Sequence, residues 1–139
     1  MRYIDAFNHF FPPRIYELML RSPAGQKDLG KRMRSVPALY DIDERLRVVD
    51  AFADYTQVIC LGMPSIDRLT DAQHAPEWAR IGNDGLADIV AKYPHHFAGY
   101  AASLPMNAPD AAANEAERVL ANGASAIQLH TNVCGRRPH

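Results

Sequence analysis

The chain has 139 residues, a mass of 15.5 kDa and a formal net charge of −1. Fifteen basic residues against sixteen acidic ones leave no cationic excess, so nucleic acid is excluded as a partner. No apolar run approaches the roughly 20 residues that span a bilayer, which excludes a membrane partner. The N-terminus shows no apolar signal region, and the isolated Cys60 and Cys134 suit a reducing compartment, so we expect a cytoplasmic location.

The first part of the chain predicts a strand followed by two helices. Residues 2–10 form a short aromatic-rich run that is closed by prolines, which predicts a strand. Residues 13–21 place apolar side chains on one face behind a proline, as in a helix. Residues 22–39 are rich in proline, glycine and cations and predict a long loop, and residues 43–54 return to helical spacing.

The second part alternates regularly between stretches with the apolar pattern of a strand and stretches with that of a helix. Residues 56–61 form a β-branched apolar run, which predicts a buried strand, and residues 76–93 predict a long helix. A strand over 97–104, an alanine-rich helix over 108–122 and a strand over 124–130 follow.

This order of elements predicts an α/β fold with a parallel sheet, because strands separated by helices form right-handed crossovers. The long helix contains Gly82 and Gly85, each of which costs about 1 kcal/mol relative to alanine inside a helix. We therefore expect both glycines to lie where a neighbouring element packs closely. The composition shows no break between domains, so residues 1–139 are expected to form a single domain.

Several stretches, in order along the chain, carry a family resemblance. They are residues 40–45 (YDIDER), 81–87 (IGNDGLA), 93–99 (YPHHFAG), 104–106 (LPM), 115–118 (EAER) and 127–135 (IQLHTNVCG). Together they resemble the amidohydrolase superfamily, in the branch typified by aminocarboxymuconate-semialdehyde decarboxylase.

The resemblance implies a TIM-type (β/α)8 barrel of which this chain supplies about the first four strands. A full barrel takes about 250 residues, so we expect the chain to be the N-terminal half of one. Half a barrel leaves two sheet edges unpaired, which proteins normally avoid. The expected partners are therefore the missing barrel half or further copies of the chain, besides a small-molecule substrate.

The family places two metal-binding histidines on its first strand in an H-x-H pattern. Residues i and i+2 of a strand point to the same side, so two imidazoles can meet one ion there. This chain has Phe7, Asn8 and His9 at the pattern, so only His9 remains as a metal ligand. The resemblance implies a divalent metal, with zinc as the expected ion in a completed barrel. The alternative is that His9 is only a hydrogen-bonded residue at the strand end.

Three further residues are candidates for the site. His130 follows the fourth predicted strand, where barrel enzymes place their chemistry, and is the candidate catalytic residue. Asn132 lies two positions further, on the same side, and is a candidate substrate-binding residue. The resemblance also implies an arginine in the loop after the first helix that holds a substrate carboxylate. Arg34 is preferred over Arg32 for this role, and a solvated basic loop is the alternative.

The sequence thus leaves three hypotheses of function. The first is a metal-dependent amidohydrolase-type enzyme, which hydrolyses or non-oxidatively decarboxylates a small carboxylated or cyclic substrate. The second is a non-catalytic or altered homologue that acts as a structural partner or is a truncated product, since Phe7 replaces a ligand. The third is a self-contained four-stranded α/β binding domain that is unrelated to barrels.

Overall fold

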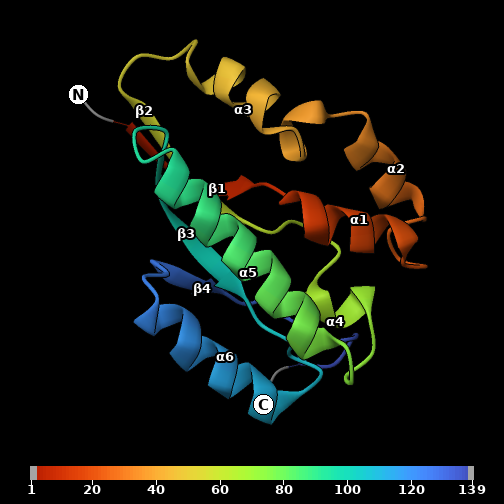
Figure 1. Cartoon of the computed structure of the whole chain (residues 1–139). Coiled ribbons are helices and arrows are strands. Elements are labelled where there is room, and N and C mark those ends of the chain that lie inside the picture. The colour runs from red at the N-terminus through yellow and green to blue at the C-terminus, as the bar shows by residue number, and fades with distance from the viewer. Residues whose placement is uncertain (1–2, 138–139) are drawn as a thin grey trace.

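Four parallel strands form one sheet in the order β1-β2-β3-β4 (Figure 1). The computed structural model describes residues 3–137, apart from the side chains of residues 28–30. The strands are β1 (Tyr3–His9), β2 (Tyr55–Cys60), β3 (Phe97–Ser103) and β4 (Ala126–Gln128). Neighbours in space are neighbours in sequence, and helices connect them, so the sheet is half of a TIM-type (β/α)8 barrel.

The connections are α-helices with one 3₁₀ turn. They are α1 (Pro13–Arg21), α2 (Asp28–Arg34), η1 (Pro37–Leu39), α3 (Ile42–Val49), α4 (Ile66–Leu69), α5 (Ala75–Lys92) and α6 (Pro109–Ala121). In Figure 1, α1, α5 and α6 lie side by side across one face of the sheet, with α5 in front of β3. Within residues 3–137, none of these helices has both the length and the apolar character needed to cross a membrane.

The hydrophobic core lies between these helices and the sheet. It contains strand residues together with residues of α1, α5 and α6; among them are Ile15, Met19, Ile59, Leu86, Phe97, Tyr100, Ala102 and Val119. Large apolar side chains of this kind contribute about 1.5–3 kcal/mol each when they are fully buried. We call this side of the sheet the covered face.

Close packing at two glycines of α5 confirms the expectation from the sequence. A Cβ on Gly82 would lie 2.7 Å from Cδ1 of Leu61, and a Cβ on Gly85 would lie 2.6 Å from Cβ of Pro12. Both distances are shorter than ordinary Cβ contacts, so a side chain at either position would force its neighbour to move. Glycine therefore lets α5 approach the segments that follow β1 and β2.

Among the residues that the structure describes, no helix lies on the opposite side of the sheet, which we call the bare face. Cys60 pairs in register with Ala101, and Ala101 pairs with Ala126, so the three share this face. Phe7 belongs to it through His9, whose ring contacts both Phe7 and Cys60. Phe7 is 69% exposed and Ala126 is exposed too. In a complete barrel this face is the filled interior.

The structure differs from the sequence prediction in its smaller elements. The predicted loop over 22–39 contains α2 and η1, and α4 was not predicted at all. Three cations occupy the last turn of α2, where they interact favourably with the helix dipole. The helix predicted over 43–54 ends at Val49. The strand predicted over 124–130 pairs over only three residues, because β3 is its sole neighbour within the described sheet.

Candidate active site

The carboxyl ends of the strands meet at one edge of the sheet, which corresponds to the catalytic mouth of a TIM-type barrel. His9, the last residue of β1, pairs in register with Cys60, the last residue of β2. Ser103, at the end of β3, pairs with Gln128, at the end of β4. His130 follows two residues later. The parallel topology therefore brings both candidate histidines to the same edge.

His9 is half-buried, and its imidazole makes two defined contacts. Its Nδ1 lies 3.3 Å from the Cys60 Sγ, and its ring meets that of Phe7 edge-on, with centroids 4.8 Å apart. Burial lowers the pKa of His9, and the charges of Arg45 and His130 lower it further. A backbone hydrogen bond at Leu61 raises the pKa but does not outweigh these effects. The neutral imidazole, which is the form that binds metals or accepts protons, is therefore favoured.

Cys60 supports the orientation of His9. The thiol is buried and lies within hydrogen-bonding distance, 3.2 Å, of the Asn8 carbonyl oxygen as well as beside the His9 ring. Burial raises the pKa of Cys60 to about 11, so the group is a neutral thiol near pH 7 and a poor nucleophile. The sequence alone did not indicate this contact between Cys60 and His9.

Arg45 of α3 fixes the end of β1 from the covered face. The buried guanidinium donates to the carbonyl of His9, to the carbonyl of Ala38 at 2.8 Å and to Oε1 of Gln57 at 3.2 Å. It also lies 5.8 Å from the centre of the Phe10 ring. Sequence reasoning missed this role. The D-x-x-x-R spacing from the helix cap Asp41 to Arg45 is a signal, although it does not show that the arginine points inward.

A polar network continues from Arg45 along the covered side of β1. The Gln57 amide donates to Oδ1 of Asn8 at 2.9 Å, and the Tyr55 hydroxyl donates to Oδ2 of Asp5 at 2.7 Å. The Tyr55 bond is the main cause that holds the pKa of Asp5 below its usual value. Asn8 and His9 thus point to opposite sides of the strand, and the backbone that carries His9 is held at several points.

His130 is half-buried and lines a narrow cleft at the mouth. Gln128 and Ser103 line the same cleft, together with the segment after β2 that includes Gly62 and Pro64. His130 is close enough to His9 for its charge to lower the pKa of His9. The structure therefore places both candidate histidines at the mouth.

Asn132 lies outside this cleft. Its side chain is exposed, and its Oδ1 accepts a hydrogen bond from the Gly135 backbone at 3.2 Å. Val133 and Arg136 bridge on either side of a tight turn in which Cys134 and Gly135 have positive φ angles. Asn132 thus stabilises the turn of a short C-terminal hairpin, and its substrate-binding role stays a prediction.

Arg34 is not brought to the histidines either. Its side chain is exposed at the end of α2, and its carbonyl accepts from the Tyr40 hydroxyl at 3.1 Å. The Tyr40 ring stacks on Tyr16 with centroids 4.4 Å apart, and the Arg34 charge counters the rise in the pKa of Tyr16 that burial causes. In the described part of the chain, no contact joins Arg34 to His9 or His130.

The residues that the structure describes do not fit a metal ion by themselves. No group of three or more His, Cys, Asp or Glu side chains among them is arranged to hold one. His9 and Cys60 offer two donor atoms, and the ring of Phe7 lies where the family pattern has its other imidazole. Tetrahedral and octahedral sites need more ligands than this.

No family model matches the chain. Its sequence is 44% identical to the γ-resorcylate decarboxylase of Polaromonas sp. over 81 residues, which are 58% of this chain and 24% of that protein. A dihydroxybenzoic acid decarboxylase from Polaromonas sp., solved with manganese and the inhibitor 2-nitroresorcinol, is 34% identical with a TM-score of 0.68. The match covers 86% of this chain and 35% of that one. The chain is therefore similar in sequence and fold to part of the amidohydrolase-type decarboxylases.

The likeness to these decarboxylases extends through the fold of almost the whole chain. The 5-carboxyvanillate decarboxylase of Novosphingobium aromaticivorans superposes with a TM-score of 0.80 over 97% of this chain and 43% of that one. At 23% identity this match shows the barrel architecture alone. The chain spans about a quarter of the curated relative it matches, and between a third and a half of the solved ones.

Proposed function

We propose that this chain is the N-terminal half of an amidohydrolase-type decarboxylase that acts on a small aromatic carboxylic acid. The observation that carries the proposal is the pair of histidines at the strand ends, His9 and His130, in a chain that is 44% identical to a γ-resorcylate decarboxylase over 81 residues. The sequence alone left hydrolysis and decarboxylation open. The relatives favour decarboxylation.

Decarboxylation requires a proton donor close to the ring carbon that loses the carboxylate. The bond between the ring carbon and the carboxylate breaks, carbon dioxide leaves, and the electron pair stays on the ring carbon, which then takes a proton. His130 is the candidate donor, because it is half-buried in the cleft and an imidazole exchanges protons near neutral pH. The restrained backbone at His9 supports a role in positioning the substrate.

A divalent metal is part of this proposal only for a completed barrel. Zinc is the ion expected from the sequence, whereas the Polaromonas relative was solved with manganese. In this chain the ligands beyond His9 would have to come from outside the described residues. We therefore assign no step of the reaction to the metal. Closure by the missing barrel half or by further copies of the chain, and a cytoplasmic location, belong to the proposal too.

Phe7 is the observation that favours the second candidate function, a non-catalytic homologue. An apolar ring occupies a position that the family pattern gives to a metal ligand, and it packs directly against His9. Such a chain would serve as a structural partner. We expect Phe7→His to raise the affinity for zinc or manganese at least tenfold in a completed barrel, measured by calorimetry. Unchanged affinity would show that this position does not limit metal binding.

A hybrid barrel tests the first proposal. The chain is joined to the C-terminal part of the Polaromonas γ-resorcylate decarboxylase, beyond the region that matches, and carbon dioxide release from 2,6-dihydroxybenzoate is followed with manganese present. We expect turnover that falls at least a hundredfold in His9→Ala and in His130→Ala. The matched control is His74→Ala, because His74 is exposed and pairs with Asp71. A folded, metal-loaded hybrid without turnover would contradict the proposal and favour the structural partner.

A further inference from the structure

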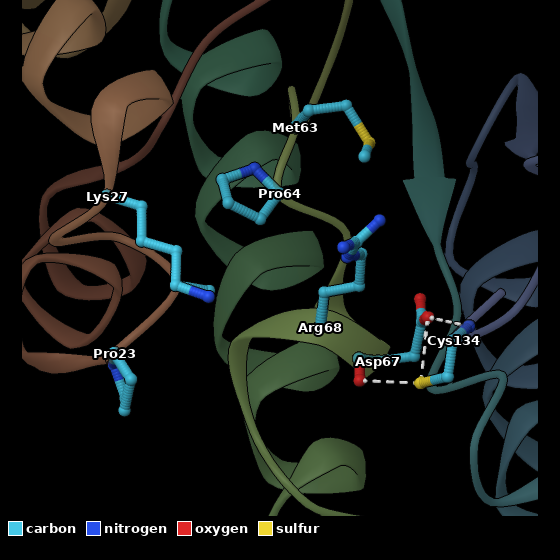
Figure 2. A pocket seen from close by; sticks show the side chains of 8 residues that line it. Pro23, Lys27, Met63, Pro64, Asp67, Arg68 and Cys134 are labelled. Carbon is cyan, nitrogen blue, oxygen red and sulfur yellow. Dashed lines mark hydrogen bonds between the residues drawn. The ribbon is translucent and has the colours of Figure 1, made fainter.

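A second cavity, of about 600 Å³, opens beside the histidine cleft. Three segments that are far apart in sequence enclose it (Figure 2): the turn between α1 and α2, the segment from β2 to α4, and the C-terminal hairpin. Its size falls within the range of small-molecule sites. Pro23, Ala24, Met63 and Pro64 give it apolar walls. None of these residues is used in the proposed reaction.

Two cations reach this cavity from different elements. Lys27 comes from the turn before α2 and Arg68 from α4, and Figure 2 shows their side chains extending into the space on either side of Pro64. Both are exposed. Among the described side chains, no carboxylate forms an ion pair with either of them, so both charges are available to a ligand.

The carboxylate that also lines the cavity, Asp67, is buried and engaged elsewhere. Its Oδ2 accepts from the Cys134 backbone N–H at 3.1 Å and lies 3.5 Å from the Cys134 thiol, which also lies 3.2 Å from the Asp67 carbonyl oxygen. Figure 2 shows this carboxylate directed to the hairpin. The positive charges of Lys27 and Arg68 therefore exceed the negative charge of Asp67, the single acidic residue of the lining.

We propose that this cavity binds a small organic acid. Its carboxylate lies between Lys27 and Arg68, and its apolar body lies against Met63 and Pro64. A guanidinium matches a carboxylate in two-point geometry, an ammonium adds a point charge, and apolar walls favour an organic body over a hydrated inorganic ion. Pro64 and Asp67 also line the His130 cleft, so the acid lies next to the mouth.

Cys134 provides a reporter within the cavity of the chain as it exists. It is an exposed free cysteine, whereas Cys60 is buried with a pKa raised to about 11 and reacts slowly. Iodoacetate carries a carboxylate, and iodoacetamide is its neutral counterpart of nearly equal size. Each forms an S–C bond as iodide leaves and the thiol proton goes to solvent. The ratio of the two rates at one pH cancels the thiolate fraction and reports how strongly the cavity attracts a carboxylate.

The ratio is measured by mass spectrometry of the peptide that contains Cys134. We expect a higher iodoacetate-to-iodoacetamide ratio in the folded chain than in urea, and a fall of roughly threefold in each of Lys27→Gln and Arg68→Gln, the effect of one partly screened charge. Lys92→Gln is the control, since it removes the same charge at the far end of α5. Equal ratios in the folded and unfolded chains, or in all three variants, would overturn the proposal.

Protection experiments then identify the ligand class. Benzoate at millimolar concentration should slow the reaction of Cys134 with iodoacetamide in the wild type and have no effect in Arg68→Gln. Protection by sulfate as strong as that by benzoate would overturn the assignment to an organic acid. Absence of protection by benzoate would overturn the site itself. The hybrid barrel plays no part in these measurements, so their outcome is separate from that of the proposed decarboxylation.

Discussion

The covered and bare faces of the sheet differ in how completely their side chains are buried or hydrogen-bonded. On the covered face, Ile59 is wholly buried and the guanidinium of Arg45 donates to three acceptors. On the bare face, Phe7 is 69% exposed and contacts only its neighbour His9 among the aromatic rings described. The helices thus stabilise half of a barrel without filling its interior, so the backbone that carries the mouth residues is packed on one side only.

The largest expected effect compares an apolar truncation on each face. Ile59→Ala should lower the free energy of unfolding by about 3 kcal/mol, because it opens a cavity in the core. Phe7→Ala should lower it by less than about 1 kcal/mol, because most of the ring is already in water. Urea unfolding followed by circular dichroism measures both, and equal losses would erase the distinction between the faces.

A smaller loss of unfolding free energy is expected when Arg45, which holds the backbone of His9, is replaced. Arg45→Ala should lower the free energy of unfolding by about 2 kcal/mol, since it removes the donor to the half-buried carbonyl of Ala38 and to the buried side chain of Gln57. Arg47→Ala is the matched control on the same helix, because that guanidinium is exposed and pairs with Glu44, and we expect little change. If the two arginine variants unfold alike, the guanidinium of Arg45 does not anchor β1.

The smallest expected effect is a pH dependence on the covered face. Arg118 and Asn83 hydrogen-bond to Glu115 and hold its pKa below the usual value, although burial opposes them. As the pH falls below about 4.5, Glu115 therefore binds a proton in the unfolded chain before it does so in the folded one. The free energy of unfolding decreases over this range, until the pH reaches the lower pKa of the folded state.

Glu115→Gln should remove this part of the acid dependence. Unfolding free energies at pH 7 and pH 3 give the measurement, and the exposed Glu117→Gln is the control on the same helix. A wild-type slope that persists unchanged in Glu115→Gln would assign the acid sensitivity to other carboxylates.

The covered face was largely predictable from the sequence because it follows periodicity. The predicted helix 13–21 is α1, and the prediction over 76–93 is within one residue of α5. Apolar spacing reports which residues face a core, and each of these helices buries one stripe. The alternation of four strands with helices followed from the same patterns, whereas the half-barrel was implied by the family resemblance.

The mouth was less predictable because its contacts join distant residues. Arg45 reaches the carbonyl of a residue 36 positions earlier, and no local pattern shows that an arginine is buried. The i+2 spacing placed Asn132 beside His130 on an extended strand, but β4 ends at Gln128 and the chain turns into a hairpin. Arg34 was expected in a loop and lies on α2, away from both histidines.

The most direct test of the central claim, that the bare face is an unfilled barrel interior, is hydrogen–deuterium exchange of the chain alone and mixed with the C-terminal part of the Polaromonas decarboxylase. We expect slower exchange of the amides in β1 and β4, the two edge strands, once the second part is present. The exchange of β2, which already has neighbours on both sides, should change least. Unchanged exchange in both edge strands, in a mixture where the two parts are folded, would show that the bare face is not an open barrel interior.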